Sequence, residues 1–439
     1  MNDRKIFAVA GRPVLHSLSP VLFRAAYPPN GSSAVYTRIA ASTADEALRF
    51  GRELGLAGLN ITAPLKDGIF ALLDRYDEAS AALGAVNTIV RDRDEYRGFN
   101  TDPAGVAGAF KRSGVDVRGR RALVLGAGGA GRAAAFALRG FGAEVVLCGR
   151  TDAKARTAAQ RVGVSAGAWA DRASLLDGCD ILVSGLPPGA EAIEPGRLRP
   201  GLIVLEAAYP DPPLSRAARA KGCLVLPGED WLFSQAVPAF RLLTGDRPDE
   251  ASMAEALKAP PRRLSRRSLN VALVGFMGSG KTAAGRRLAQ TLGLAFEDSD
   301  ARVEQRMGRP IPEIFGGEGE AAFRREESRA LGEILEGRTG VVCACGGGSM
   351  ESPENRALVA KSALVVWLHA PVSVCLSRID PGTRPLLGQG PGSEAAFEAL
   401  FRARLSCYAE ASDIAVGSDG SEELTARTIH EEIRRVVTD

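Results

Sequence analysis

The chain has 439 residues, of which 45% are hydrophobic and 24% charged, and its net charge is +3. This length predicts two or three domains, because single cores stop growing at roughly 250–300 residues, and the composition is that of a soluble globular protein. The small net charge and the lack of an apolar stretch of roughly 18–20 residues argue against nucleic acid and membrane partners. Seven scattered cysteines without a C-x-x-C pair favour reduced thiols over disulfides or a metal site, and with them a cytoplasmic location.

Short apolar runs alternate with longer Ala-, Leu- and Arg-rich helical patterns from one end of the chain to the other. The clearest runs are 122–125, 144–147, 271–274 and 364–368. Because these runs are continuous rather than alternating, they predict strands buried on both faces and therefore parallel sheets in an α/β fold.

A basic segment with two prolines at 258–268 interrupts this pattern. Its four arginines and single leucine cannot form a core, so we interpret it as a solvated linker in preference to an RNA-binding arm. The linker separates a C-terminal domain, 269–439, from two N-terminal halves. These are a substrate-binding half, 1–100 completed by 236–257, and a dinucleotide-binding half, 101–235.

Three short motifs in the N-terminal part combine small polar residues with proline. They are Gly11–Pro20, Asn60–Lys66 and Asn100–Pro103. Taken singly, each is also typical of ordinary structure: a helix cap and turn, a strand end with a surface lysine, and an Asp cap followed by proline. The residue chemistry alone therefore leaves their role open.

A glycine-rich turn, Gly126–Gly131, follows the predicted strand 121–125 and opens an Ala-rich helical pattern. In this strand–turn–helix context, G-x-G-x-x-G predicts a dinucleotide-binding turn. An NAD site presents an acidic residue about twenty residues later, whereas this chain has cations there, which suit the 2′-phosphate of NADP. A basic strand end in an Arg-rich protein is the alternative. The residues expected to contact the cofactor are Gly126, Gly128, Gly129, Gly131, Arg150, Thr151 and Lys154.

In the C-terminal domain, Gly275–Thr282 matches G-x-x-x-x-G-K-[ST] directly after the predicted strand 270–274. In this context the motif predicts a phosphate-binding loop, in which backbone N–H groups and a helix N-terminus surround the phosphates of ATP. We expect Lys281 to reach the β- and γ-phosphates and Thr282 to supply a hydroxyl to Mg²⁺. The glycines of the loop are Gly275, Gly278 and Gly280.

Three further clusters narrow the substrate of this domain. Asp298 and Asp300 follow an apolar run; one carboxylate can hold Mg²⁺ through water and the other can accept hydrogen bonds from a polyol, although the pair alone is also typical of a helix cap. Arg324 lies on a predicted helix, where its planar guanidinium group can bind a carboxylate through two hydrogen bonds. The alternative is that Arg324 is one of several exposed charges spaced three residues apart on the helix. Gly346–Gly348 ends a predicted strand and lets backbone approach a ligand closely.

Together these motifs resemble the shikimate kinase family over essentially the whole of 269–439. The family's P-loop, D-x-D, F-R-x-x-E, GGG, R-P-L-L and R-x-x-x-Y are all present, the last two as Arg384–Leu387 and Arg404 with Tyr408. The resemblance implies a P-loop kinase fold of three α/β/α layers with ATP, Mg²⁺ and shikimate as ligands. It implies that Arg384 closes over ATP and that Asp298 lies near Mg²⁺ or the attacking hydroxyl. The residues that it assigns to shikimate are Asp300, Arg324, Gly347, Gly348 and Arg404.

The N-terminal motifs, taken in order, resemble the shikimate dehydrogenase family over about residues 5–257. The family's G-x-P-x-x-H-S-x-S-P, N-x-T-x-P-x-K, G-A-V-N-T, N-T-D, glycine turn and late Gln are all present. The resemblance implies a substrate-binding α/β domain and a Rossmann-type NADP domain, with Lys66 and Asp102 as the catalytic pair. A proton must move to or from the substrate oxygen as a hydride is exchanged, and a Lys beside an Asp can carry it. The residues that the resemblance assigns to the substrate are Ser17, Ser19, Thr62, Asn87, Tyr209 and Gln235.

Departures from the dehydrogenase pattern lie mostly in the cofactor half. Gly149 replaces a usual Asn, and Ser184–Leu186 replaces an N-A-T stretch. Glu206 replaces a common Asp before Tyr209, and Pro103 stands where Gly is frequent. These departures bear on cofactor affinity and NADP preference more than on the identity of the substrate.

The two resemblances together predict a bifunctional enzyme of the shikimate pathway. NADPH would reduce 3-dehydroshikimate to shikimate, and ATP would convert shikimate to shikimate 3-phosphate. One alternative is a kinase attached to a degenerate dehydrogenase domain that binds or regulates; intact Lys66 and Asp102 argue against it. The other is a dehydrogenase for quinate or with NAD, and Arg150 argues against NAD.

Overall fold

The computed structural model describes residues 4–27, 34–93, 95–187, 189–190, 192–259, 264–265, 268–379 and 393–438. The chain forms two compact units. Unit 1 consists of residues 1–20, 32–62 and 260–439, and unit 2 consists of residues 21–31 and 63–259. The domain boundaries expected from the sequence stay a prediction.

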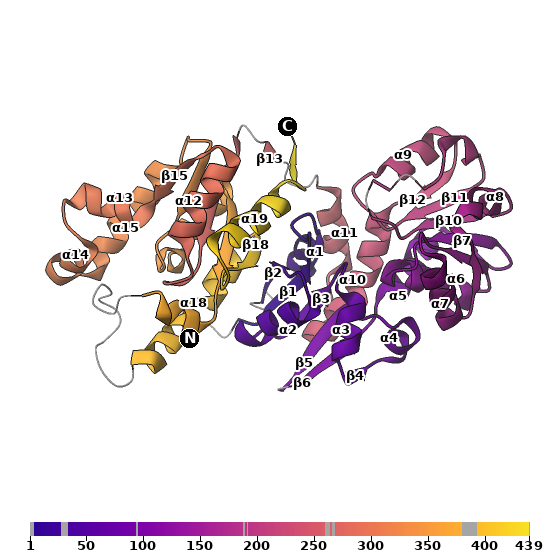
Figure 1. Ribbon diagram of the computed structural model, residues 1–439, viewed down its shortest axis with the longest axis horizontal. Helices are drawn as coiled ribbons and strands as arrows, with labels where there is room; N and C mark the ends of the chain where they lie inside the picture. Colours follow the sequence, from indigo (N-terminus) through magenta and orange to yellow (C-terminus); the bar gives the residue numbers. More distant parts are fainter. Residues whose placement is uncertain are drawn as a thin grey trace. The chain divides into compact units, whose positions relative to one another are not determined.

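A parallel sheet forms the centre of unit 1 (Figure 1). In spatial order its strands are β15 (Ala295–Asp298), β16 (Val341–Ala344), β14 (Val271–Val274), β17 (Leu364–His369), β18 (Ile414–Gly417), β2 (Val35–Ala40), β1 (Ile6–Gly11) and β3 (Gly58–Ile61). Each strand is parallel to its neighbour. Strands from the C-terminal part of the chain thus continue into strands from the N-terminal part, where Ala415 pairs with Ile39 and Val416 with Ala40.

The central strands of unit 1 are covered on both faces. Every residue of β14, β16 and β17 is buried, which confirms the predicted parallel α/β layering. The helices of this unit are α2 (Ala44–Glu53), α12 (Lys281–Leu292), α13 (Ser299–Met307), α14 (Ile311–Glu318), α15 (Glu320–Leu335), α16 (Pro353–Ser362), α17 (Val372–Ser377), α18 (Ser393–Ala411) and α19 (Glu422–Ile433). Helices α12 and α19 pack on each other. A short pair of strands, β13 (Leu264–Ser265) and β19 (Val437–Thr438), uses two residues of the predicted linker.

A second parallel sheet belongs to unit 2 (Figure 1). In spatial order its strands are β12 (Leu224–Leu226), β11 (Ile203–Glu206), β10 (Ile181–Ser184), β7 (Arg121–Leu125), β8 (Glu144–Cys148) and β9 (Ser165–Gly167). Strand β7, which comes first in the sequence among the strands of this sheet, lies at its centre, and the strand order reverses between β7 and β10. This is the order of doubly wound dinucleotide-binding sheets, so the predicted Rossmann-type fold is confirmed.

Alternate residues of the unit 2 strands enter two separate cores. Ala122 and Val124 of β7 face one hydrophobic cluster, while Leu123 and Leu125 face the other. The period of two is that of any strand, and both faces are apolar because helices cover both.

The helices of unit 2 cover this sheet and pack on three further strands. They are α3 (Lys66–Leu72), α4 (Glu78–Leu83), α5 (Asp102–Ser113), α6 (Gly129–Gly140), α7 (Asp152–Val162), α8 (Arg172–Asp177), α9 (Pro213–Ala220), α10 (Gly228–Thr244) and α11 (Glu250–Lys258). The three further strands, β5 (Thr88–Asp92), β6 (Glu95–Phe99) and β4 (Arg75–Tyr76), lie side by side in this order, and β6 is antiparallel to β5. Helix α10 packs along α5, and Phe240 of α10 contacts Phe23 of α1 (Ser19–Ala26), with ring centroids 5.7 Å apart.

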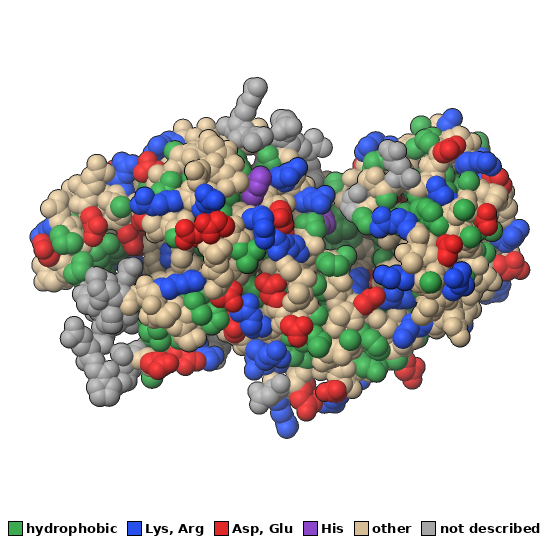
Figure 2. All heavy atoms as spheres, in the orientation of Figure 1, with side chains coloured by type: hydrophobic (Ala, Val, Ile, Leu, Met, Phe, Trp, Pro, Cys, Tyr) green, Lys and Arg blue, Asp and Glu red, His purple; other side chains and the backbone are tan. Residues whose placement is uncertain are grey.

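Acidic and basic side chains are mixed over the visible face of the molecule (Figure 2). Among the described residues, none of the helices has the length and apolar character that crossing a membrane requires.

Candidate active sites

The predicted dinucleotide turn lies at the carboxyl end of β7. Gly128 is the N-cap of α6. A Cβ atom on Gly131 would overlap the carbonyl oxygen of Gly126, and one on Gly185, after β10, would lie 2.8 Å from the backbone nitrogen of Gly131. Neither position has room for a side chain, so the turn leaves bare backbone N–H groups at the start of α6. That arrangement binds a pyrophosphate group.

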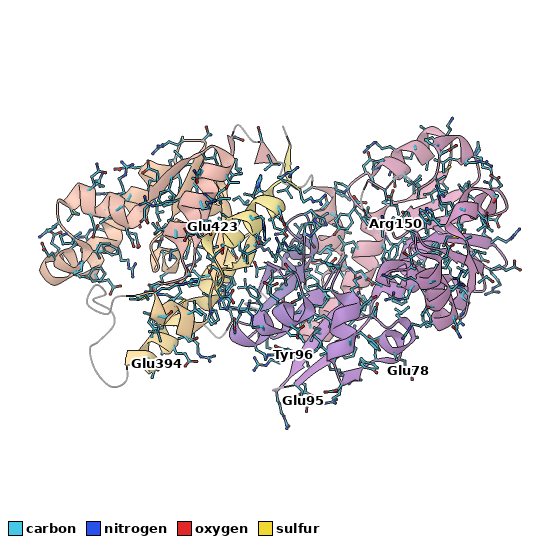
Figure 3. The ribbon with its side chains drawn as sticks, viewed as in Figure 1. Glu78, Glu95, Tyr96, Arg150, Glu394 and Glu423 are labelled. Carbon is cyan, nitrogen blue, oxygen red and sulfur yellow. The ribbon has the colours of Figure 1, made fainter. Side chains whose placement is uncertain are left out.

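Exposed basic residues, rather than an acidic residue at the strand end, follow the next strand, β8. Arg150, labelled in Figure 3, is exposed, as are Thr151 and Lys154. The acid in this segment, Asp152, accepts the backbone N–H of Trp169 at 3.0 Å. Cations at this position fit the 2′-phosphate of NADP.

Two departures from the dehydrogenase pattern have local explanations. At Gly149, a Cβ atom would lie only 3.1 Å from the Cβ of Ala127 in the dinucleotide turn. Glu206 is buried at the end of β11 and accepts the Ser215 hydroxyl at 3.1 Å. Burial raises the pKa of Glu206, and the hydrogen bonds from Ser215 oppose that rise.

The predicted catalytic pair is formed in unit 2. Lys66 begins α3 and Asp102 begins α5, and Lys66 Nζ lies 2.5 Å from Asp102 Oδ2. The two side chains are 17% and 5% exposed, so water screens their attraction little. A Cβ atom on Gly129 would lie 3.2 Å from Lys66 Cδ. The lysine stem therefore lies against the dinucleotide turn.

Asn87 links this pair to α10. Its Nδ2 lies 3.0 Å from Asp102 Oδ1, 2.9 Å from Thr101 Oγ1 and 2.8 Å from Gln235 Oε1. Its Oδ1 accepts the Thr101 N–H at 2.9 Å. Four of the predicted residues therefore form one polar cluster with limited access to water: Lys66, Asn87, Asp102 and Gln235. Tyr209 is half-buried beyond the end of β11.

The remaining predicted dehydrogenase residues lie in unit 1, beyond the carboxyl ends of β1 and β3. The hydroxyls of Ser17 and Ser19 are 3.2 Å apart. Thr62 donates its N–H to the carbonyl oxygen of Ala10 at 2.9 Å. Because β1 and β3 are adjacent and parallel, these hydroxyl-bearing segments leave the same edge of the sheet.

The phosphate-binding loop joins β14 to α12, as predicted. A Cβ atom on Gly278 would clash with the carbonyl oxygen of Cys375, so this part of the loop must be bare backbone. Lys281 Nζ lies 2.9 Å from the carbonyl oxygens of both Gly275 and Phe276. The ammonium group thus lies over the concave side of the loop, where the motif places nucleotide phosphates.

Thr282 and Asp298 lie side by side at this loop. Thr282 donates its hydroxyl to Asp298 Oδ2 at 2.8 Å. Asp298 also caps α13, because its Oδ1 accepts the Asp300 N–H at 3.0 Å. The helix-cap interpretation of Asp298 is therefore correct. The same carboxylate lies beside the Thr282 hydroxyl, and such a pair suits Mg²⁺, which is bound through few protein ligands and through the nucleotide phosphates.

Arg324, Arg404 and the Gly346–Gly348 turn come together beside Asp300. Arg404 Nη1 lies 3.5 Å from the carbonyl oxygen of Gly347. A Cβ atom on Gly348 would clash with the Arg324 guanidinium, and one on Gly346 would lie 2.5 Å from Asp300 Oδ1. The structure therefore gathers two cations and a carboxylate around bare backbone. Arg384 lies outside the described residues.

Two glutamates hold these arginines: Glu327, the last residue of the F-R-x-x-E motif, to which the sequence argument gave no role, and Glu351, which it did not single out. Glu351 accepts Arg404 Nε at 2.7 Å and Arg404 Nη2 at 3.2 Å, and its Oε2 is 3.6 Å from Arg324 Nη2. Glu327, which is 1% exposed, accepts Arg324 Nη1 at 2.9 Å and the Ser349 hydroxyl at 2.8 Å. The spacing of three residues between Arg324 and Glu327 on one helix could have indicated the second pair, whereas nothing local indicated Glu351.

Two family models match the chain. Residues 9–89 match the shikimate dehydrogenase substrate binding domain, and residues 277–435 match shikimate kinase. The shikimate dehydrogenase (NADP(+)) of Anaeromyxobacter dehalogenans is 39% identical over 267 residues, which cover 58% of this chain and 96% of that protein.

Solved structures match the same part of the chain. The shikimate dehydrogenase of Aquifex aeolicus matches with a TM-score of 0.55 and 29% identity, over 59% of this chain and 100% of that one. The shikimate 5-dehydrogenase of Thermus thermophilus, in complex with NADP(H) and shikimate, matches with a TM-score of 0.52 and 34% identity, over 58% of this chain and 98% of that one.

Proposed function

Because the chain belongs to the shikimate dehydrogenase family and carries a shikimate kinase domain, we propose that its two sites catalyse consecutive reactions. The first is the NADPH-dependent reduction of 3-dehydroshikimate to shikimate. The second is the ATP-dependent phosphorylation of shikimate to shikimate 3-phosphate. The observation that carries the proposal is that each site keeps its reactive pair in contact: Lys66 with Asp102, and Thr282 with Asp298 beside Lys281.

In the dehydrogenase, NADPH would supply a hydride to the substrate carbonyl carbon. Lys66 gives a proton to the carbonyl oxygen, and Asp102, which contacts the lysine Nζ, orients it. In the reverse direction the same amine takes the proton from the shikimate hydroxyl. Asn87 and Gln235, already hydrogen-bonded to each other, orient the hydroxyl groups of the ring, as do Ser17, Ser19, Thr62 and Tyr209.

The dinucleotide turn and the basic end of β8 support NADP as the cofactor. Gly126–Gly131 and the start of α6 would hold the pyrophosphate, and Arg150, Thr151 and Lys154 would hold the 2′-phosphate. The steric reasons for Gly149 and Gly185 indicate that these departures maintain the turn, which argues against a degenerate cofactor site.

In the kinase, catalysis rests on positioning and charge neutralisation. Gly275, Gly278, Gly280 and Lys281 hold the phosphates, and Thr282 with Asp298 would hold Mg²⁺. Arg324, Arg404 and the backbone of Gly347 and Gly348 hold the substrate carboxylate end, and Asp300 accepts hydrogen bonds from ring hydroxyls. The substrate hydroxyl oxygen attacks the γ-phosphorus, the bond to the bridging oxygen of ADP breaks, and the hydroxyl proton leaves through Asp298 or water. The closure over ATP is assigned to Arg384 only by the resemblance to shikimate kinases, because this residue lies outside the described ranges.

Two assays on the purified chain test the proposal. Shikimate with NADP⁺ should yield NADPH, which is detected by its absorbance. Shikimate with Mg-ATP should yield ADP. Phosphorylation without NADP⁺ reduction would refute the dehydrogenase half, and NADP⁺ reduction without phosphorylation would refute the kinase half.

A further inference from the structure

The loop between β1 and α1, which carries Ser17 and leads into Ser19 at the start of α1, is held by a helix of the kinase domain. Glu432 of α19 accepts the backbone N–H groups of Val14 and Leu15 on one carboxylate oxygen, each at 2.9 Å. The glutamate is 1% exposed, and both backbone groups are buried. All of these residues belong to unit 1.

A second connection holds the same loop from the neighbouring strand. Arg38 of β2 donates from Nε and Nη2 to the Ser17 carbonyl oxygen at 3.0 and 2.7 Å. Its Nη1 donates to the carbonyl oxygen of Asp413, just before β18, at 3.0 Å. Beside it, the hydroxyls of Thr37 and Ser412 are 3.1 Å apart. The guanidinium therefore links the loop to the kinase sheet.

Exposed ion pairs also join the N-terminal and C-terminal segments of unit 1. Arg12 binds Glu431 at 2.7 Å, and Arg49 binds Asp419 at 2.7 Å. Exposed pairs of this kind contribute little to stability. The buried glutamate differs, because hydrogen bonds to a charged acceptor are stronger and removing it leaves two buried N–H groups without a partner.

Burial and the neighbouring groups act on the pKa of Glu432 in opposite directions, and burial has the larger effect. Burial raises the pKa of this carboxyl group, while the N–H groups of Leu15 and Val14 and the guanidinium groups of Arg12 and Arg435 oppose the rise. None of the kinase motifs includes Glu432, so phosphoryl transfer gives no reason for a buried carboxylate at this position.

We propose that α19 of the kinase domain is a positioning element of the dehydrogenase, and that it acts through Glu432. The carboxylate fixes the backbone at Val14 and Leu15, and through it the direction of the Ser17 and Ser19 hydroxyls. This inference rests on the proposed role of the two serines as substrate ligands. The kinase domain thus completes the shikimate-binding loop of its fusion partner.

Two variants of the full chain, Glu432→Ala and Glu432→Gln, test the proposal. For shikimate oxidation with NADP⁺, we expect Glu432→Ala to raise KM for shikimate about tenfold or more, because two buried donors lose their acceptor. Glu432→Gln keeps a carbonyl acceptor and should show a smaller rise. The KM for NADP⁺ and both KM values of the kinase should not change, and kcat of oxidation should change less than KM.

Glu423→Ala is the matched control, because Glu423 is an exposed glutamate on the same helix (Figure 3). It should leave every constant unchanged. Kinase activity in each variant reports that the chain has folded. If Glu432→Ala loses both reactions, the KM of Glu432→Gln for shikimate becomes the test. A wild-type KM for shikimate in a folded Glu432 variant overturns the proposal.

Hydrogen–deuterium exchange separates this inference from the proposed activity. If the wild-type chain reduces no NADP⁺, the dehydrogenase assignment fails, whereas the contact can still be measured. Amide exchange at Val14 and Leu15 should then be faster in Glu432→Ala than in Glu423→Ala. Equal exchange in the two variants would show that α19 does not hold the loop.

Discussion

Arg404 needs a negative partner before its substrate arrives. It is 3% exposed, and a buried guanidinium without a counter-charge is costly. Glu351 meets this need with a two-point contact, which is the geometry that a substrate carboxylate would use. In the proposed kinase site, the glutamate and the substrate carboxylate would therefore compete for the Arg404 guanidinium.

Glu351→Gln should accordingly strengthen shikimate binding at the kinase. The amide leaves Arg404 without a full counter-charge in the free enzyme, and the substrate carboxylate restores it. We expect KM for shikimate to fall severalfold, and the free protein to lose about 1–3 kcal/mol of stability, which shikimate should recover in a thermal unfolding experiment. Glu354→Gln, an exposed neighbour, is the control. A rise in KM would show instead that Glu351 orients Arg404 for catalysis.

Arg150 is the residue from which NADP preference is predicted. Replacing it with Ala removes a cation from the expected 2′-phosphate position, so KM for NADP⁺ should rise about tenfold while KM for NAD⁺ changes little. Steady-state kinetics with both cofactors measure the ratio. Arg156→Ala, which removes an exposed cation from the next helix, should not alter it. An unchanged ratio in Arg150→Ala would place the 2′-phosphate elsewhere.

At the scale of elements, the dinucleotide turn depends on the close approach of the ends of β7 and β10. Gly185→Ala would place a Cβ atom 2.8 Å from the Gly131 nitrogen. Either the turn or the strand end must move, so we expect KM for NADP⁺ to rise at least several-fold and stability to fall by about 1–3 kcal/mol. Gly196→Ala, where a Cβ atom meets nothing within 4 Å, is the control. Wild-type cofactor affinity in Gly185→Ala would mean that the turn tolerates displacement.

The same elements show what sequence could and could not provide. Both glycine-rich turns were predicted, because a strand, a G-x-G-x-x-G or P-loop pattern and a helix follow one another locally. Glu432 was missed because a single glutamate on an amphipathic helix carries no sign of being buried. The pairing of β18 with β2 was missed as well, because a continuous apolar strand indicates burial but not which strand lies beside it.

At the scale of the whole molecule, the pairing of β18 with β2 makes one parallel sheet of strands from both enzymes within unit 1. Without β18, strand β2 would present bare N–H and C=O groups, which pair readily with other chains. The kinase domain therefore protects an edge of the dehydrogenase sheet.

A chain cut to residues 1–259 tests this protection. We expect this fragment to self-associate in size-exclusion chromatography, and the same fragment with Thr37→Lys, which charges the freed edge, to associate less. Addition of a 260–439 fragment should reverse the association. A 1–259 fragment that keeps the oligomeric state of the full chain would contradict the account.

The two-site claim itself is tested by following 3-dehydroshikimate with NADPH and Mg-ATP in one reaction. The wild-type chain should form shikimate 3-phosphate, while Lys281→Ala should stop at shikimate and Lys66→Ala should form neither product yet still phosphorylate added shikimate. Mixing the two variants should restore shikimate 3-phosphate, because each supplies the site that the other lacks. If either single variant abolished both reactions while remaining folded, the account of two separate active sites on one chain would be wrong.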